Sequence, residues 1–106
     1  MKFLLFSMYD AAKQAEIAQI ADKAHTSAPP GRKLLATYVC LGMPFANVPR
    51  NTLVSISVVE AESAEAMAAA TYPLTLAGAT IWHVPVMELP AGGVANVEKK
   101  MRSRTG

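Results

Sequence analysis

The sequence predicts a single α+β domain in which helices cover one face of an antiparallel sheet. The chain has 106 residues, which is the size of one ordinary domain. Hydrophobic residues make up 52% of it and charged residues 17%, a composition that excludes a disordered chain. Strand-like and helical patterns alternate in the order strand, helix, strand, strand, helix, strand. We expect these elements to form one domain over residues 1–90, followed by a tail over residues 91–106.

The first half of the chain predicts a strand, a helix and a second strand. Residues 2–8 form a short apolar and aromatic run that is typical of a strand, and Asp10 is suited to cap a following helix. Residues 11–25 carry apolar side chains at helical spacing. Because two prolines at positions 29 and 30 cannot continue a helix, we expect a turn there and a second strand over residues 33–42.

The second half predicts a strand, a short helix and a last strand. Residues 52–60 alternate apolar and polar side chains, which indicates a strand with two different faces. An alanine-rich helix is expected over residues 64–72, closed by Pro73. The last strand covers residues 79–89, and Pro85 within it indicates an edge position or a bulge, since proline cannot donate to a central ladder.

The connection over residues 43–51 is unusually apolar for a loop between two strands. Its prolines and asparagines are typical of a turn, yet Met43, Phe45 and Val48 are not. We expect these three side chains to lie in a contact between subunits, with a lid over a pocket as the alternative.

The alternation predicts which side chains of the third strand meet the helices. We expect Val54, Ile56 and Val58 to pack on the helices, which leaves Ser55 and Ser57 on the other face of the sheet. The same argument on the last strand directs Trp82, Val84 and Val86 toward the helices and His83 toward the opposite face.

The order βαββαβ is the ferredoxin-like plan, in which both helices lie on one face of the sheet. The other face stays uncovered, and burial against an identical subunit is a simple way to cover it. We therefore expect a homodimer, or a higher oligomer in which identical subunits cover this face.

Three segments make the chain resemble the dimeric α+β barrel superfamily over residues 1–90: Met1-Lys2-Phe3-Leu4-Leu5-Phe6, Glu62-Ser63-Ala64-Glu65-Ala66 and Ala79-Thr80-Ile81-Trp82-His83-Val84-Pro85-Val86-Met87-Glu88-Leu89. It is most similar there to small stand-alone members, including muconolactone isomerase-like and uncharacterised proteins. The resemblance implies a homodimer with a ligand pocket between sheet and helices or inside the barrel. It implies no single activity, because members include isomerases, monooxygenases without cofactors, haem enzymes and ligand sensors.

His83 is the best candidate for a catalytic residue, since it is the only residue within a predicted strand whose ordinary pKa lies near neutrality. A hydrogen-bonded histidine at a subunit contact is the alternative. Tyr38, Ser55, Ser57 and Ser7 are candidate ligand-binding residues, although the pattern does not decide whether Tyr38 or its neighbours on the second strand face the pocket. The serines lack the sequence context of a nucleophile.

Several classes of function are not expected. One cysteine and two distant histidines make no metal pattern, and only His83 would be available to bind haem, so we expect no cofactor and no metal. Residues 66–87 carry no charge, but Pro73, Gly78 and Pro85 interrupt them, so we expect no membrane span. The single Cys40 and the lack of a usual signal-peptide pattern indicate a cytoplasmic protein.

The tail is basic. It holds Lys99, Lys100, Arg102 and Arg104 against Glu98 alone, although the whole chain has a net charge of only +2. Without interleaved aromatic residues this cluster does not predict a nucleic-acid site. We expect a short helix or an arm that contacts a second subunit.

Two functions fit these observations. The first is a homodimeric barrel that binds a small aromatic or cyclic organic compound and acts on it without a cofactor, as an isomerase, cyclase or monooxygenase, with His83 as acid and base. The alternative is a ligand-binding or assembly domain without catalysis.

Overall fold

The computed structural model describes residues 1–26 and 31–105, and it confirms the α+β class. The six elements of the body are β1 (Lys2–Asp10), α1 (Gln14–Thr26), β2 (Arg32–Val39), β3 (Thr52–Ala61), α2 (Ala64–Leu76) and β4 (Thr80–Val86). A 3-10 turn, η1 (Ala11–Lys13), joins β1 to α1, and a further helix, α3 (Val94–Thr105), follows the body. The turn predicted at residues 27–30 lies outside the described residues.

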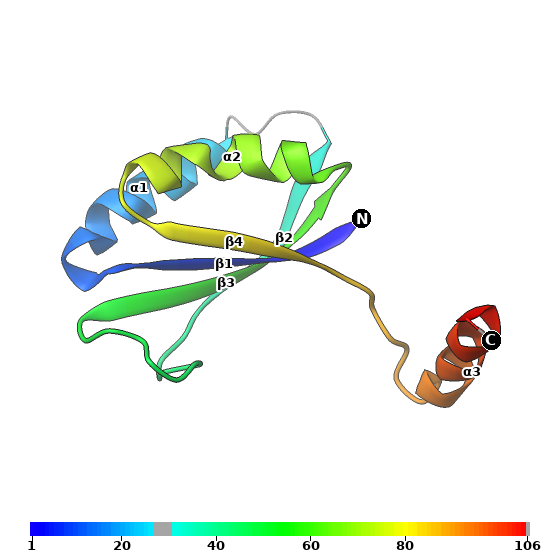
Figure 1. Ribbon diagram of the computed structural model, residues 1–106. Coiled ribbons are helices and arrows are strands. Elements are labelled where there is room, and N and C mark those ends of the chain that lie inside the picture. The colour runs from blue at the N-terminus through cyan, green and yellow to red at the C-terminus, as the bar shows by residue number, and fades with distance from the viewer. Residues whose placement is uncertain (27–30, 106) are drawn as a thin grey trace.

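The sheet has the strand order β2-β3-β1-β4, and all neighbouring strands are antiparallel. Both α1 and α2 lie on one face of it, as Figure 1 shows. This is the ferredoxin-like topology, so that prediction is confirmed. Because β4 is an edge strand, the placement of Pro85 at an edge is confirmed as well.

Side-chain caps fix the start of the helical segments. An oxygen of Asp10 accepts a hydrogen bond from the backbone N–H of Ala12 at 2.9 Å, and the hydroxyl of Ser63 accepts one from Ala66 at 3.1 Å. The prediction that Pro73 closes α2 is wrong, because the helix continues to Leu76. A proline removes a single backbone bond there, and the buried Leu74 in the next position holds the last turn against the core.

The helix-facing side of the sheet carries the core. On β1 this side holds Phe3, Leu5, Ser7 and Tyr9, all of which are buried. One cluster of core residues joins Phe3 and Leu5 to Val59, Ala61 and Met67. A second cluster joins Tyr9 to Ile17, Leu74 and Ala79.

The predicted orientation of β3 is wrong. Ser55 pairs with Ser7 and Ser57 pairs with Leu5, so both serines face the helices. Val54, Ile56 and Val58 lie on the opposite side, which we call the open face. The alternation shows that the two sides differ, but β1 is apolar on both sides, so polarity does not tell which side the helices cover.

The predicted orientation of β4 is wrong for the same reason. His83 pairs with Leu5 and faces the helices, whereas Trp82, Val84 and Val86 lie on the open face. Trp82 stacks on Phe6 there, with ring centroids 5.2 Å apart and an angle of 7° between the rings.

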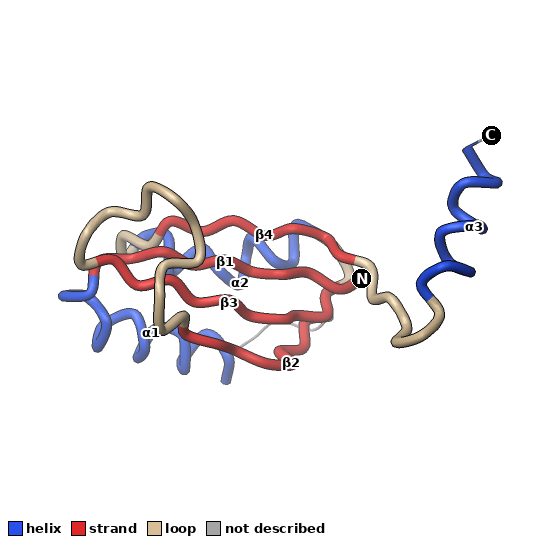
Figure 2. The backbone as a smooth tube through the Cα atoms, turned by 90° about the horizontal axis from the view of Figure 1, so that it is seen from below, coloured by secondary structure: helices blue, strands red, loops and turns tan. Residues whose placement is uncertain are grey.

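The connection between β2 and β3 folds back over the open face of its own sheet (Figure 2). The ring of Phe45 lies 5.8 Å from that of Phe6 and 6.0 Å from that of Trp82. Asn47 and Asn51 adopt positive φ angles, which asparagine tolerates better than most residues, and these let the loop turn back. The apolar character of this loop therefore serves to cover part of one sheet face within the chain.

Helix α3 stands apart from the body at the end of the segment that follows β4 (Figure 1). The radius of gyration is 16.1 Å, compared with about 13 Å for a compact chain of this length. Among the described residues, no helix is long and apolar enough to cross a membrane.

Candidate functional site

A trough lies between α1 and the helix-facing side of β1, β2 and β3. Its volume is about 220 Å³. Its floor includes Leu5, Ser7, Thr37, Ser55 and Ser57, which come from three adjacent strands. Because all five belong to the same side of the sheet, the trough is a property of the fold and not of a surface loop.

Small side chains on α1 explain why this space is not filled. The helix turns Ala18, Ala21 and Ala24 toward the trough, at intervals of three residues along one side. Helix α2 packs directly on β3 and β4, whereas α1 packs chiefly on α2. The trough opens along β2, where Thr37 and Val39 are exposed.

Ser57 and Ser7, both on the floor of the trough, differ in their hydrogen bonding. The hydroxyl groups of Ser57 and Thr37 lie 3.1 Å apart and share a hydrogen bond. Ser7 is only 6% exposed, and its hydroxyl has no hydrogen-bond partner among the described residues. A buried hydroxyl without a partner is uncommon in native proteins, so Ser7 is a polar group on the trough floor whose hydrogen-bonding capacity the described residues leave unused.

The two ends of the trough carry ionisable groups. At one end burial raises the pKa of the Tyr9 hydroxyl, and a hydrogen bond with the Gln14 side chain partly offsets this rise. At the other end burial lowers the pKa of the Arg32 guanidinium. The Nε atom of Arg32 is buried and has no hydrogen-bond partner among the described residues.

The structure brings three of the five predicted site residues together. Ser7, Ser55 and Ser57 line the trough. Tyr38 lies on the open face and is 62% exposed, so it is separated from the serines by the sheet itself. The sequence does not decide which side of the second strand faces the pocket. In the structure Thr37 and Val39 face the trough, and Tyr38 does not.

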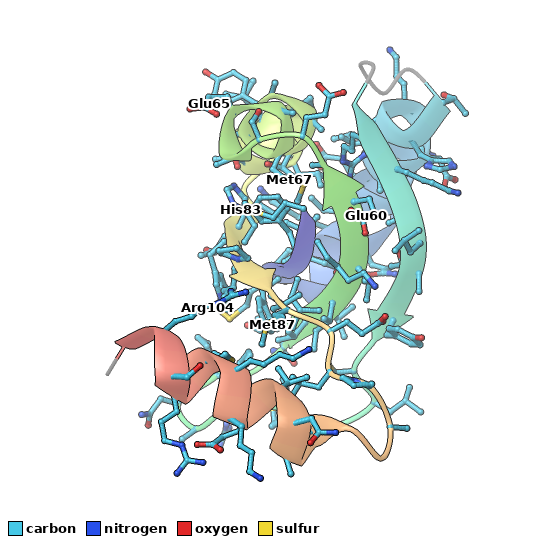
Figure 3. The ribbon with its side chains drawn as sticks, turned by 90° about the vertical axis from the view of Figure 1, so that its right-hand side faces the viewer. Glu60, Glu65, Met67, His83, Met87 and Arg104 are labelled. Carbon is cyan, nitrogen blue, oxygen red and sulfur yellow. The ribbon has the colours of Figure 1, made fainter. Side chains whose placement is uncertain are left out.

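His83 does not reach the trough. His83 on β4 lies opposite Leu5 on β1, and Leu5 lies opposite Ser57 on β3. His83 and Ser57 are therefore two strands apart, a distance of about 10 Å. Its ring meets Phe3 edge-on at 6.0 Å, and Figure 3 shows it on the α2 side of β4. A role of His83 in catalysis stays a prediction, and its half-buried ring packs against Phe3.

Arg32, Thr37 and Tyr9 belong to the site but were not predicted. A bulge between Leu34 and Ala36 shifts the alternation of β2 by one residue, so that Arg32 and Thr37 face the same side. No signal in the sequence identifies this bulge. Tyr9 could have been found, since it continues the alternation that places Ser7 toward the helices.

Comparison with known proteins matches the chain to solved structures alone. No protein-family model matches the chain, and no curated protein matches it. Among solved structures, it is similar to a DUF3240 family protein from Shewanella baltica, with 14% identity, a TM-score of 0.48, and coverage of 85% of this chain and 94% of that one. It is also similar to a putative amidohydrolase/peptidase from Burkholderia cenocepacia, with 11% identity, a TM-score of 0.41 and coverage of 98% of this chain. The match spans 33% of the latter protein, and neither likeness informs the function of this chain.

The described residues include no group of three or more histidine, cysteine or acidic side chains arranged to hold a metal ion. Cys40 is a free, half-buried thiol. The polar side chains that line the trough are hydroxyl groups, the Gln14 amide, the Asp22 carboxylate, the His25 imidazole and the Arg32 guanidinium, set among apolar walls.

Proposed function

We propose that this protein binds a small organic molecule in the trough between α1 and the sheet. The observation that carries the proposal is the buried, unpartnered hydroxyl of Ser7. Leaving such a group without a partner costs about 1–3 kcal/mol, and a ligand that hydrogen-bonds to it removes that cost.

The walls of the trough define the kind of molecule. Leu5, Ile17, Leu34 and Leu74 provide apolar contacts, and most of the exposed surface of the trough is apolar. A cavity of about 150 Å³ admits a molecule as large as benzene, so a trough of about 220 Å³ accepts a small organic compound. An apolar body with one or two polar groups fits this lining best.

Binding without proton transfer at His83 is the function that the geometry supports best. A general base must come within hydrogen-bond reach of the proton it moves, and His83 lies on the far side of β1 from Ser55 and Ser57 and is not among the residues that line the trough. An isomerase, cyclase or monooxygenase acting on an aromatic or cyclic compound would need an acid or base other than His83, and His25 and Asp22 are such groups on the trough lining.

We also propose a homodimer formed through the open face, in keeping with the resemblance to the dimeric α+β barrels. The support is the apolar character of this face, where Leu4, Ile56 and Val58 lie beside the Phe6–Trp82 pair and Phe45 covers only part of the surface. An assembly domain that binds no ligand is the competing function, favoured by the separate position of α3.

The test is to fill the trough. Replacing Ala21→Leu places a larger side chain between α1 and the serines, and we expect it to abolish ligand-induced thermal stabilisation in a screen of small organic molecules. Ala69→Leu is the matched control, because Ala69 is an exposed alanine of α2 outside the trough. If both variants respond to the same compounds as the original protein, the ligand does not bind in the trough and the proposal fails.

A further inference from the structure

The Arg32 end of the trough holds a cation that forms no ion pair with the described residues. Arg32 is half-buried, and its Nε atom is buried without a partner among the described residues. Asp22 lines the same trough from α1, and the carboxylate of Glu62 lies beside Gly31, but neither forms an ion pair with Arg32. Buried charges in proteins are paired, and the buried Nε atom of the half-buried Arg32 lacks a partner among the described residues, so this end is suited to an anionic group from outside the chain.

The charge of that anionic group follows from the charges around it. Arg32 is the only lysine or arginine among the described residues that line the trough, where Asp22 and His25 are further ionisable side chains and most of the exposed wall is apolar. One guanidinium balances one negative charge and can donate two parallel hydrogen bonds to a carboxylate. A doubly charged phosphate would leave excess negative charge in apolar surroundings, which is costly.

The shape of the trough defines the rest of the molecule. Its lining runs along α1 from Gln14 to His25, which corresponds to roughly 16 Å at the helical rise of about 1.5 Å per residue. From the Arg32 end, an aliphatic chain would pass Leu34 and the Ser57–Thr37 pair in the direction of Ser7. A slender chain follows such a trough better than a compact ring does.

We infer that the ligand is a slender aliphatic monocarboxylate whose carboxylate binds Arg32, an inference that rests on the proposed binding function and names its ligand class. The carboxylate lies against the guanidinium, and the alkyl chain lies between the alanines of α1 and the floor of the trough.

The experiment compares octanoate, octan-1-ol and octylamine in calorimetric titrations of the full chain. We expect octanoate to bind at least 10-fold more tightly than octan-1-ol, and octylamine to bind least. Lengthening the acid from hexanoate to decanoate is expected to raise the affinity about three- to fourfold per methylene group.

Variants of Arg32 identify the group that recognises the acid. Arg32→Gln is expected to weaken octanoate binding about 10- to 100-fold and to leave octan-1-ol unchanged, and Arg32→Lys is expected to lose only part of the affinity. Lys33→Gln is the matched control, because Lys33 is the next residue of β2, is exposed, and points to the open face. Melting curves of each variant establish that it is folded.

The outcomes separate this inference from the proposed function. If octanoate and octan-1-ol bind equally and Arg32→Gln changes neither, while Ala21→Leu blocks both, the trough binds small molecules but the carboxylate inference is wrong. If inorganic phosphate binds at Arg32 as tightly as octanoate, the inference of an aliphatic acid is also wrong. If none of these probes binds to the full chain, the inference is wrong, whereas the proposed function fails only if the wider screen with Ala21→Leu also finds no ligand in the trough.

Discussion

Ser7 and Ser57 are two buried serines of one trough, and only Ser57 has a described hydrogen-bond partner. We expect Ser7→Ala to leave the free energy of unfolding unchanged or to raise it by up to about 1 kcal/mol, because it removes an unsatisfied group. Ser57→Ala removes the hydrogen bond with Thr37 and is expected to lower the free energy of unfolding by about 0.5–1.5 kcal/mol. Urea denaturation of the two variants without ligand measures the difference, and a larger loss in Ser7→Ala would show that its hydroxyl is already satisfied.

The buried hydroxyl of Tyr9 makes the stability depend on pH in the alkaline range. Burial raises its pKa above the ordinary value of 10.0, so the folded protein keeps this proton at a pH where the unfolded chain has released it. The contribution to stability is therefore fully present below about pH 10 and is lost as the pH rises through the folded-state pKa.

We expect Tyr9→Phe to reduce this alkaline loss, although it also removes the hydrogen bond with Gln14. The free energy of unfolding of both proteins, measured in urea from pH 8 to above pH 10 (roughly the range in which tyrosine ionises), provides the comparison. Parallel curves for the two proteins would contradict a raised pKa at Tyr9.

For single residues, the sequence predicts which serines belong to the site better than it predicts the side of the sheet on which they lie. Ser7, Ser55 and Ser57 stand out because they interrupt apolar strands, and they do meet in one place. Their orientation could not be predicted, since both sides of β1 are apolar. Arg32 could not be assigned to the site because its position depends on a bulge that leaves no trace in the pattern.

Among the elements, the loop between β2 and β3 acts as a partial cover for the open face. Phe45→Ala removes the ring that lies against Phe6 and Trp82, and we expect it to lower the free energy of unfolding by about 1–2 kcal/mol. Trp82 is the only tryptophan, so its fluorescence emission should also shift to longer wavelength as water reaches the indole. Met43→Ala in the same loop is the control, because Met43 makes no ring contact and is exposed; equal shifts in both variants would contradict the role of Phe45.

The order and type of the elements follow from the sequence, because hydrophobic periodicity and capping residues are local signals. The end of α2 does not, since burial of Leu74 against the core outweighs the local effect of Pro73. The packing of the loop over the open face could not be predicted either, because it joins Phe45 to side chains that are distant in the sequence.

For the whole molecule, the open face leads to a prediction about assembly. Val84 lies on this face at the edge strand and is 43% exposed in the single chain. We expect Val84→Glu to weaken a dimer formed through the face by about 100-fold or more, because the carboxylate would be buried without a partner. Light scattering coupled to size-exclusion chromatography measures the mass against the 11.3 kDa of one chain.

Leu76→Glu provides the comparison for this experiment. Leu76 ends α2 and is 69% exposed, and it belongs to the helical layer on the other side of the sheet. We expect this variant to keep the mass of the original protein. A monomeric original protein, or a dimer that survives Val84→Glu, would contradict assembly through the open face.

The bulge in β2 has a consequence for aggregation as well as for the site. An edge strand with a regular row of unpaired N–H and C=O groups can be extended by the same strand of another chain, and repeated extension produces fibres. The extra residue Leu35 interrupts the regular spacing of these groups on β2, so a second chain cannot continue the sheet in register. Deleting Leu35 would therefore restore a straight edge, to which further chains could be added without limit.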